Sequence, residues 1–584
     1  VEFELKDGEV TGSLDTTVSY GALWRVTGRD KENVALANGG SKSSANYDDG
    51  NLNYDRGDLV SSLFKMTNDL DLNYKNFGAF LRVTSFYDEA AEGKKFTRSG
   101  TYTRGNESVF HNRLGHDYEI LDAYVRGKFD VFGKALDIRA GKQVVSWGES
   151  TFIPNGINII NPVDVAKLRA PGSEVKEAFL PVNMLWLSQE INDNLSIEAF
   201  NQFEYKKTRL DPSGSYFSTN DFISPGGQQI NGGSGVVNEG NATLINGVIP
   251  RDPDDDPKDS GQFGFASRLL VPSLNNTEFA FYFAQYHSRT PQISGTAAAA
   301  PTANPSPPFP AGTRNITGLR YNTTYAEKIR LYGLSFNTAG PLGLALQGEY
   351  SYRPNQPVQM AATDLIVELL TAGTATTAVD VQSLGGFGPN SKAKGYKSVK
   401  YHQAQITGTK SFGPVMKANQ LLGIFEAGYV YQDLDKNIAF NANGVDFGVS
   451  PTAASVLGTS LQNGGLQTKQ SYGYRALLRS EYNSAIGAVN LSPRVAWSHD
   501  LRGTSQNFSQ GVKAISIGLG ASYQQNLQAD ISYTNFFGGE SFSGFARGSA
   551  GMAPATSADG LPARSSNNPL SDRDFVAATV SYSF

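Results

Sequence analysis

The sequence contains no cysteine, and only five of its 584 residues are histidine. The lack of cysteine excludes disulfide bonds, thiolate metal sites and a cysteine nucleophile. No run of about 18 or more apolar residues occurs, which excludes a protein that crosses a membrane with helices. The net charge of -5 is spread along the chain without a basic block, so the sequence argues against nucleic acid as a partner.

Glycine and aromatic residues are abundant instead. The chain contains 62 glycine, 34 phenylalanine and 27 tyrosine residues, a composition that is typical of all-β proteins with many turns. The same composition runs from end to end, and no shift marks a domain boundary. We therefore expect residues 1–584 to form a single all-β domain.

Alternation of apolar and polar residues runs through many segments and predicts strands with one apolar face. In the first segment, Tyr20 and Trp24 fall on the apolar face and Ser19 and Arg25 on the other. The pattern recurs in residues 64–74, 77–84, 121–129, 527–534 and 574–584. Within the third of these segments, the alternation assigns Leu121 to the apolar face.

The predicted strands are long, short and long connections alternate, and aromatic residues gather near strand ends. These features are typical of a transmembrane antiparallel β-barrel, whose strands are apolar outside and polar inside. A sheet that spans hydrocarbon must close on itself, because its edges would otherwise lack hydrogen-bond partners. We therefore expect a barrel with short periplasmic turns and long extracellular loops, in the outer membrane of a Gram-negative bacterium.

Short turns set the expected number of strands. Eight of them fall at residues 75–76, 130–134, 191–194, 273–276, 339–343, 413–419, 483–488 and 524–526. With both termini on the periplasmic side, these turns imply about 18 strands, within a range of about 16–18.

The chain ends in DFVAATVSYSF, a strand whose last residue is aromatic. We expect this strand to close the barrel against the first one. The ending resembles the terminal strands of Gram-negative outer-membrane proteins, which the barrel assembly machinery reads. The resemblance implies that Tyr582 and Phe584 form the assembly signal.

One long connection, residues 144–181, is too apolar for a solvated outer loop and too rich in glycine and proline for a strand. Its isoleucines, among them Ile153, Ile157 and Ile160, must be buried against other apolar side chains. We expect residues 147–181 to fold into the lumen as a constriction or plug. The alternative is a packed surface loop that stabilises the outer rim of the barrel.

Three groups of residues in this segment are candidates for function. The candidates for contact with a hydrophobic ligand are Trp147, Phe152 and Ile153. The amides that can satisfy irregular backbone or hold the segment to the wall are those of Asn155, Asn158 and Asn161. The charged residues expected to latch the segment to the wall are Glu149, Asp164, Lys167 and Arg169.

Charges of both signs fall on the predicted inner faces of the strands. They are Arg25, Lys65, Asp69, Arg82, Asp122, Arg126, Lys128 and Arg139. Opposed ladders of such charges would create the transverse field of a porin, which selects small polar solutes. A wall that faces water or a plug needs polar residues in any case, so these charges leave a polar channel and a plugged hydrophobic conduit both open.

Asp252, Asp254 and Asp256 stand at alternate positions in an acidic loop and are candidates for binding Ca²⁺. The glycine and the closing glutamate of a complete calcium loop are missing, and an unliganded, solvated loop is the alternative. We expect no other cofactor.

Few residues offer catalytic chemistry. Neither a GxSxG nucleophile motif nor HxxxH or HExxH metal spacing occurs. The nearest approach to a catalytic cluster is His111, His116 and Asp117, and we expect the protein not to be an enzyme.

The run SWGESTFIPNGINIINPVDV, the opening VEFELKDGEVTGSLDTTVSYGALWRVTGRD and the later YFSTNDF carry a resemblance. Across essentially the whole chain, the sequence resembles an uncharacterised family of Gram-negative outer-membrane proteins that carries a domain-of-unknown-function label. The resemblance implies an outer-membrane barrel associated with a periplasmic lipoprotein-carrier-like protein and an RND-type exporter. Such partners imply lipids, sterols or other hydrophobic compounds as cargo.

Three functions are open on these grounds. The first is passage of hydrophobic or amphipathic molecules across the outer membrane, which the non-polar run FIPNGINIINPV at residues 152–163 favours. The second is a porin-like diffusion channel for small polar or anionic solutes. The third is a non-conducting structural or surface barrel. In each case the expected surroundings are outer-membrane lipid and lipopolysaccharide.

Overall fold

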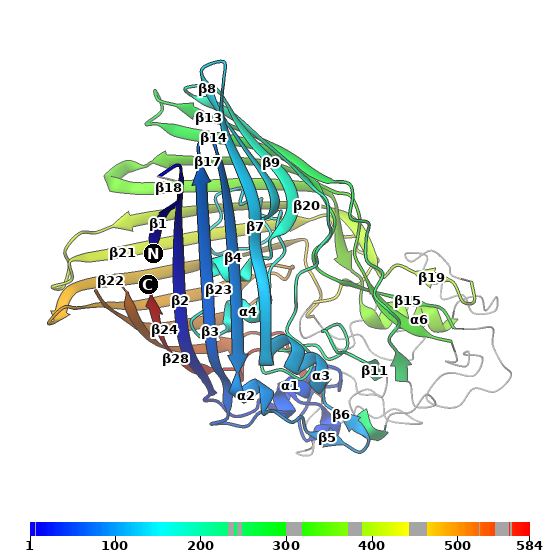
Figure 1. Ribbon diagram of the computed structural model, residues 1–584. Coiled ribbons are helices and arrows are strands. Elements are labelled where there is room, and N and C mark those ends of the chain that lie inside the picture. Colours follow the sequence, from blue (N-terminus) through cyan, green and yellow to red (C-terminus); the bar gives the residue numbers. More distant parts are fainter. Residues whose placement is uncertain are drawn as a thin grey trace.

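The computed structural model describes residues 1–5, 8–231, 239–241, 248–298, 318–371, 388–442, 464–524, 526–543, 560 and 563–584. Eighteen strands form a closed antiparallel barrel, as the alternation and the number of short turns predicted, and the short β1 (Glu2–Leu5) pairs with the first of them. Figure 1 shows the long strands side by side, with the helices and small strands gathered mostly at one end.

The barrel strands follow one another around the wall in chain order. They are β2 (Val10–Arg25), β3 (Leu59–Tyr74), β4 (Phe77–Asp88), β7 (His116–Val131), β8 (Lys134–Gln143), β9 (Val182–Asn192), β10 (Leu195–Gln202), β13 (Gln262–Val271), β14 (Thr277–Tyr286), β17 (Ile329–Ala339), β18 (Leu344–Gln359), β20 (Tyr396–Ser411), β21 (Gln420–Gln432), β22 (Gln470–Ile486), β23 (Val489–Arg502), β24 (Val512–Tyr523), β25 (Leu527–Gly538) and β28 (Phe575–Ser583). All eight predicted short turns join neighbouring strands of this series at one end of the barrel.

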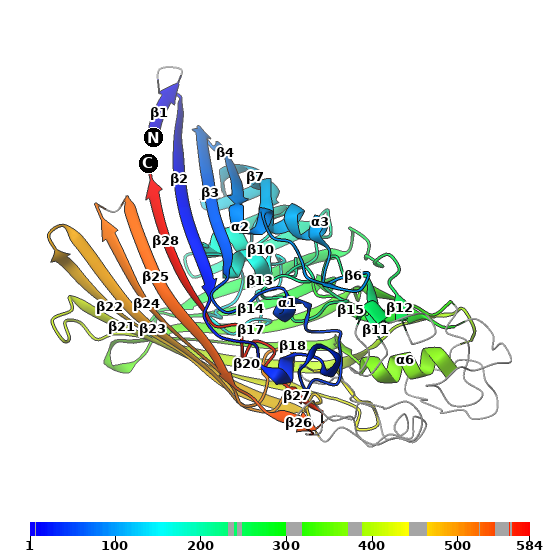
Figure 2. The same ribbon diagram turned by 90° about the horizontal axis from the view of Figure 1, so that it is seen from below.

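The last strand closes the barrel against the first, as predicted. β28 pairs with β25 on one side and with β2 on the other, from Thr17 opposite Ser583 to Arg25 opposite Phe575. Phe584 continues the ladder, because it exchanges two backbone hydrogen bonds of 2.9 Å with Thr16. β1 lies along the same edge of β2, beyond the end of β28, so the two chain ends lie close together (Figure 2).

The two faces of the wall follow the predicted alternation. Outward residues such as Tyr20, Phe64 and Val580 are about half exposed, whereas the neighbouring Ser19 is buried. An apolar outer surface is what hydrocarbon requires of a spanning barrel.

The assignment of Leu121 to the apolar outer face was wrong. A β-bulge between β4 and β7 lets Leu81 pair with Ala123 and Val83 with Ile120, so Leu121 and Asp122 both oppose a single residue of β4. A bulge of this kind re-aims side chains. Ile120 is exposed on the outside, while Leu121 is fully buried.

Shorter elements fill the connections. The helices are η1 (Lys31–Asn33), η2 (Leu36–Asn38), α1 (Asp49–Leu52), α2 (Glu89–Glu92), α3 (Glu107–Phe110), the π-helix η3 (His111–Gly115), α4 (Val165–Arg169), α5 (Val175–Ala178), η4 (Glu239–Asn241), η6 (Pro341–Gly343) and α6 (Ala362–Thr371). The small strands are β5 (Arg98–Ser99), β6 (Tyr102–Thr103), β11 (Gln229–Asn231), β12 (Val248–Pro250), β15 (Gln292–Thr296), β16 (Arg320–Thr324), β19 (Lys392–Ala393), β26 (Ser541–Ser543) and β27 (Arg564–Ser566). Among the described residues, no helix has both the length and the apolar character needed to cross a membrane.

Candidate functional site

The connection between β8 and β9 contacts the inward-facing side chains of the wall. We call residues 147–181 the inner segment. Glu349 of β18 holds its first part, because the carboxylate accepts backbone hydrogen bonds from Glu149 (2.6 Å), Ser150 (3.2 Å) and Ile157 (2.9 Å). A chain without regular secondary structure needs such partners, since buried backbone groups are costly to leave unpaired.

Glu426 of β21 holds the next part in the same way. Its carboxylate accepts hydrogen bonds from the backbone of Thr151 (2.9 Å), Phe152 (2.7 Å) and Ile153 (2.8 Å), and its side chain is fully buried. Three consecutive N–H groups thus converge on one carboxylate.

The backbone carbonyls of this part also have partners on the wall. Arg353 of β18 donates to the carbonyls of Asn155 and Gly156, and Gln403 of β20 donates to that of Pro154 (2.8 Å). Both the donors and the acceptors of the irregular backbone are therefore satisfied by side chains of β18, β20 and β21.

The second part of the inner segment reaches the opposite side of the barrel. Glu177 of α5 pairs with Lys65 of β3 and accepts a hydrogen bond from Thr67 (2.8 Å). Lys167 of α4 lies 2.7 Å from Glu119 of β7. In the closed strand order, β3 and β21 lie on opposite sides, so the inner segment extends across the interior from one wall to the other.

The predicted ligand contacts have different surroundings. Trp147 is buried against Phe200 and Tyr282, and its indole N–H donates to Glu198 (2.8 Å). Ile153 is buried beside Tyr401, Val430 and Phe508. Phe152 is 39% exposed. The first two residues therefore pack the inner segment against the wall.

The three asparagines bind polar groups, each in its own way. Asn161 accepts a hydrogen bond from the Val145 backbone (2.9 Å) and donates to the carbonyls of Gln143 (3.1 Å) and Leu180 (3.0 Å). Asn155 donates to the Asn507 side chain and Asn158 to that of Ser146. Asn161 thus ties the beginning of the connection to its end.

The charged residues of the inner segment contact several partners. Asp164 caps α4 by accepting a hydrogen bond from Lys167, and it lies 3.6 Å from both Arg113 and Arg209. Glu149 accepts a hydrogen bond from Asn337 of β17 (3.3 Å). The remaining pairs, of Lys167 with Glu119 and of Arg169 with Asp211, involve oppositely charged groups.

A cavity of about 110 Å³ lies between α4 and the wall formed by β2, β3 and β4. We call it the inner cavity. Its lining is mainly apolar and includes Leu63, Phe86, Phe110, Leu114, Ala166 and Phe217. Of the ten residues predicted for the inner segment, those that line it are Asp164, Lys167 and Arg169. Sequence alternation did not indicate this cavity, because its lining comes from six separate parts of the chain.

A second cavity, of about 360 Å³, lies on the other side of α4. It is surrounded by the long connections at the end of the barrel opposite the short turns, which we call the outer loops. This outer cavity has a more polar lining, with Asn33, Lys42 and Asn220 among its residues. Both cavities share Arg169, Asp211 and Phe217 in their linings.

The shared residues form a small barrier. Arg169 lies 2.6 Å from Asp211, and its guanidinium lies over the Phe217 ring at 5.2 Å from the centroid. Burial raises the pKa of Asp211, while the nearby Arg169 opposes this shift. These three side chains lie between the more polar outer cavity and the mainly apolar inner one.

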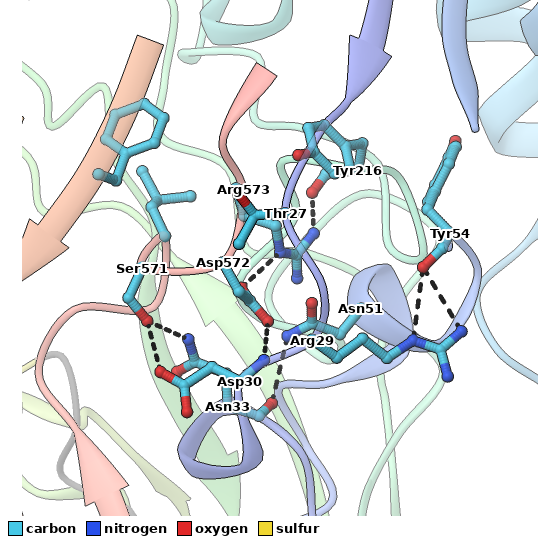
Figure 3. Close-up of polar contacts among 12 residues, drawn as sticks. Thr27, Arg29, Asp30, Asn33, Asn51, Tyr54, Tyr216, Ser571, Asp572 and Arg573 are labelled. Carbon is cyan, nitrogen blue, oxygen red and sulfur yellow. Dashed lines mark hydrogen bonds and ion pairs between the residues drawn. The ribbon is translucent and has the colours of Figure 1, made fainter. Parts of the chain in front are cut away.

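A polar cluster links the end of β2 and the residues before β28 to Tyr54 and Tyr216 (Figure 3). The fully buried Arg573 pairs with Asp572 (3.3 Å) and donates to the carbonyl of Tyr216. Arg25 donates to the carbonyl of Tyr54 (2.9 Å) and lies 3.5 Å from Asp572. Tyr54 and Tyr216 both line the inner cavity, so this cluster fixes the position of that part of the lining, which we call the cavity roof.

Several of the predicted lumen charges pair with neighbouring strands. Arg82 lies 2.7 Å from Asp69 and 3.3 Å from Asp122, and Arg126 lies 2.7 Å from Asp71. These pairs place opposite charges side by side on β3, β4 and β7. They differ from the opposed ladders that a transverse field would need.

The other predicted lumen charges have different surroundings. The guanidinium of Arg139 lies over the Trp186 ring, 4.5 Å from its centroid. Lys128 is exposed near the short-turn end of β7. Arg25 belongs to the polar cluster, and Lys65 binds the inner segment.

The prediction of Ca²⁺ at Asp252, Asp254 and Asp256 does not fit the structure, because these carboxylates face basic side chains. Lys207 lies 2.8 Å from Asp254 and 3.1 Å from Asp256, while Arg251 lies 2.9 Å from Asp254. Asp252 is 3.9 Å from Arg320. The three carboxylates do not converge into a metal-binding group.

The histidines considered for catalysis bind neighbouring groups. His111 lies 3.0 Å from the Lys94 carbonyl, and His116 lies 2.5 Å from the Glu92 carboxylate. Asp117 accepts a hydrogen bond from the Tyr118 backbone. The three side chains therefore have separate partners rather than a shared catalytic arrangement.

Comparison with known proteins gives one sequence match and several structural ones. The family described as Protein of unknown function (DUF1302) matches residues 2–584. No curated protein matches the sequence. Among solved structures, Acinetobacter baumannii OccAB1 is similar at 8% identity and a TM-score of 0.40, over 98% of this chain and 96% of that one. Pseudomonas aeruginosa OccK2 (OpdF) in complex with glucuronate is similar at 9% identity and a TM-score of 0.38, over 98% of both chains.

Proposed function

Because this chain belongs to the DUF1302 family of proteins of unknown function, we infer its role from its own structure and propose that it carries hydrophobic or amphipathic molecules across the outer membrane. The observation that supports the proposal most directly is the mainly apolar inner cavity beside the polar outer one. Ligand sites for molecules of this kind are usually apolar cavities with a few polar groups that set orientation.

In this proposal the inner segment is the plug. It is anchored to both sides of the interior, so passage follows the cavities beside α4. The apolar part of a cargo molecule would lie among Leu63, Phe86 and Phe110, while a polar end group would face the charged side chains near Arg169. Release from the inner cavity then requires the α4 region to move relative to the wall.

The alternative of a polar diffusion channel rests on the charged inner faces. Arg82 pairs with Asp69, and Arg126 pairs with Asp71. Neighbouring opposite charges largely cancel their field at a distance, so these pairs argue against the transverse field of a polar channel. The two adjoining cavities favour the transport proposal over a non-conducting barrel.

Location and partners are part of the same proposal. The apolar exterior would face outer-membrane lipid, with lipopolysaccharide around the loops. The barrel assembly machinery would read Tyr582 and Phe584 during insertion. A periplasmic lipoprotein-carrier-like protein and an RND-type exporter would exchange cargo with the short-turn end of the barrel.

A flux measurement with a cavity-filling variant tests the function. The protein is reconstituted in liposomes, and entry of a fluorescent fatty acid is compared with entry of a neutral monosaccharide. Ala166→Trp places a large ring in the inner cavity, whereas Leu168→Trp adds a similar ring to an exposed position of the same helix.

We expect Ala166→Trp to slow fatty-acid entry about tenfold, the effect of about 1.4 kcal/mol, while Leu168→Trp retains the native rate. Rapid monosaccharide entry that Ala166→Trp leaves unchanged would support the polar channel. Equal fatty-acid entry with and without protein would remove the hydrophobic-cargo proposal.

A further inference from the structure

Four carboxylates that the transport proposal does not use meet in the interior of the outer loops. Asp48 and Asp49 stand at the start of α1, Asp221 follows β10, and Glu239 begins η4. All four are at least 95% buried. One ligand oxygen from each of the three aspartates lies within 4.8 Å of the others.

Each carboxylate has one oxygen held by the protein. Asp48 Oδ2 accepts hydrogen bonds from the Ala35 backbone (2.9 Å) and the Asn38 amide (3.0 Å). Asp49 Oδ2 accepts one from the Tyr102 hydroxyl (2.9 Å), and Asp221 Oδ2 one from the Asp49 backbone (3.3 Å).

Glu239 follows the same rule, since its Oε1 accepts a hydrogen bond from the amide of Asn38 (3.4 Å). Asn38 thus contacts two of the four acids and fixes their relative position. In each carboxylate, only one oxygen remains for another partner.

The remaining oxygens are buried and have no hydrogen-bond partner in the described part of the chain. They are Asp48 Oδ1, Asp49 Oδ1, Asp221 Oδ1 and Glu239 Oε2. Native proteins rarely leave so many buried acceptors unsatisfied in one place. The unsatisfied oxygens are therefore an observation separate from the clustering of acids, and they point to a ligand that supplies positive charge.

Two cations act on the acids: Arg104 and Lys42 offset part of the charge of Asp48, and Arg104 offsets part of that of Glu239. Four buried carboxylates with only this partial compensation are unfavourable. Either protons or a cation must neutralise them.

We propose that Asp48, Asp49, Asp221 and Glu239 form a binding site for a divalent cation, with Ca²⁺ as the expected ion. Ca²⁺ prefers hard oxygen ligands and accepts six to eight of them in variable geometry, whereas Mg²⁺ retains several waters and binds through one or two carboxylates. The donor set contains neither histidine nor cysteine, the ligands that zinc sites most often use.

The ion would join two connections that are separate in sequence, and Tyr102 of a third would support one of its ligands. Asp48 and Asp49 follow β2, Tyr102 follows β4, and Asp221 and Glu239 follow β10. Tyr54 and Tyr216, which line the inner cavity, lie within six residues of the proposed ligands. The cation therefore stabilises the roof of that cavity, although the site itself does not depend on what the barrel transports.

The test uses the full-length protein in detergent, stripped with a chelator and titrated with Ca²⁺ alone. Binding is counted by equilibrium dialysis with radioactive Ca²⁺, and Tb³⁺ luminescence excited through tyrosine reports whether the ion lies near Tyr102. The test variant is Asp49→Asn/Asp221→Asn. Its matched control is Asp254→Asn/Asp256→Asn, which changes two acids that already face Lys207.

We expect one Ca²⁺ per chain in the native protein and in the control, with a rise in thermal midpoint on addition of Ca²⁺. The test variant should lose this site and its Ca²⁺-dependent rise. Tyr102→Phe, which removes a partner of Asp49 but no ligand, should weaken binding about tenfold.

The proposal is overturned if the stripped native protein binds no Ca²⁺ and its midpoint does not change, since protons would then neutralise the acids. It also fails if the test variant binds as the native protein does. Should the test variant not fold, the native titration and Tyr102→Phe still decide the question. A loss of binding only in the control would place the ion at Asp254 and Asp256 instead.

Discussion

Single carboxylates take the place of secondary structure where the chain crosses the interior. Glu349 and Glu426 each accept three backbone hydrogen bonds from the inner segment, and both belong to strands about 200 and 275 residues away in sequence. A helix or strand would have satisfied those N–H groups locally. The wall does so here, which leaves the inner segment dependent on a few side chains.

Replacing Glu426 by alanine should release the part of the inner segment around Phe152. Three backbone N–H groups would lose a charged acceptor, each hydrogen bond of this kind contributing about 1.5–3 kcal/mol. We expect limited proteolysis to cut the variant within residues 147–163 at least ten times faster than the native protein, as a change of about 1.4 kcal/mol would give.

Glu190→Ala removes an exposed carboxylate from β9 and serves as the control for this experiment. It should be cut at the native rate. Equal protection of the Glu426 variant and the native protein would show that other contacts hold the segment.

A second prediction at this scale concerns Asp254 in the outer loops. Partial burial would raise its pKa, but hydrogen bonds from Lys207 and Arg251 lower it to about 2. Because the folded pKa lies below the unfolded value of about 3.9, the contribution to stability is complete above about pH 4 and is lost as the pH falls through about 2.

Asp254→Asn should therefore lower the free energy of unfolding at pH 6 by no more than about 2 kcal/mol. The difference should disappear as the pH approaches about 2. Thermal midpoints of both proteins across this range provide the measurement. A difference that persists unchanged at the lowest pH would contradict the electrostatic explanation.

At the scale of elements, the terminal strands have unequal roles. β28 joins β25 to β2 and closes the wall, whereas β1 pairs with one edge of β2 only. Removal of residues 582–584 would break the pairing of Tyr582 with Val18 and both hydrogen bonds of Phe584 with Thr16. Removal of residues 1–5 would leave the closure intact.

The native barrel should stay folded when a sample in detergent is run on a gel without heating. We expect the deletion of residues 582–584 to abolish this resistance to unfolding. The matched N-terminal deletion should retain that resistance, because β2 and β28 still pair. Equal behaviour of the two deletions would contradict the unequal roles of these strands.

Elements were the easiest part of the molecule to predict from the sequence. The two-residue period and the short turns follow from local chemistry, so several strands, all eight turns and the number of strands were predicted correctly. Leu121 was assigned to the wrong face because a β-bulge depends on pairing with β4, which alternation within one strand does not reveal.

The surroundings of the inner segment could be predicted only in part. Its isoleucines indicated that the segment must be buried. Trp147 and Ile153, however, were predicted to contact a ligand, whereas in the structure they pack against the wall. The anchors Glu349, Glu426 and Arg353 gave no signal in their own strands, where they read as ordinary polar positions. The acids at Asp49 and Asp221 were equally inconspicuous, because only the fold brings them together.

At the scale of the whole molecule, a wide barrel would leave a large aqueous lumen without internal structure. The inner segment divides this one, with anchors on β3 and β7 on one side and on β18 and β21 on the other. The cavities beside α4 differ in polarity, and the pair of Arg169 with Asp211 lies between them. This arrangement is the basis of our proposal that amphipathic molecules pass beside α4.

The most direct measurement of this account is the ionic conductance of the purified protein in a planar bilayer, compared with that of Glu349→Ala/Glu426→Ala. We predict that the native barrel shows no steady open level and that the double variant opens a large pore, because its inner segment has lost both carboxylate anchors. A native protein that already conducts steadily, with a clear ion preference, would contradict the account and establish the polar channel in its place.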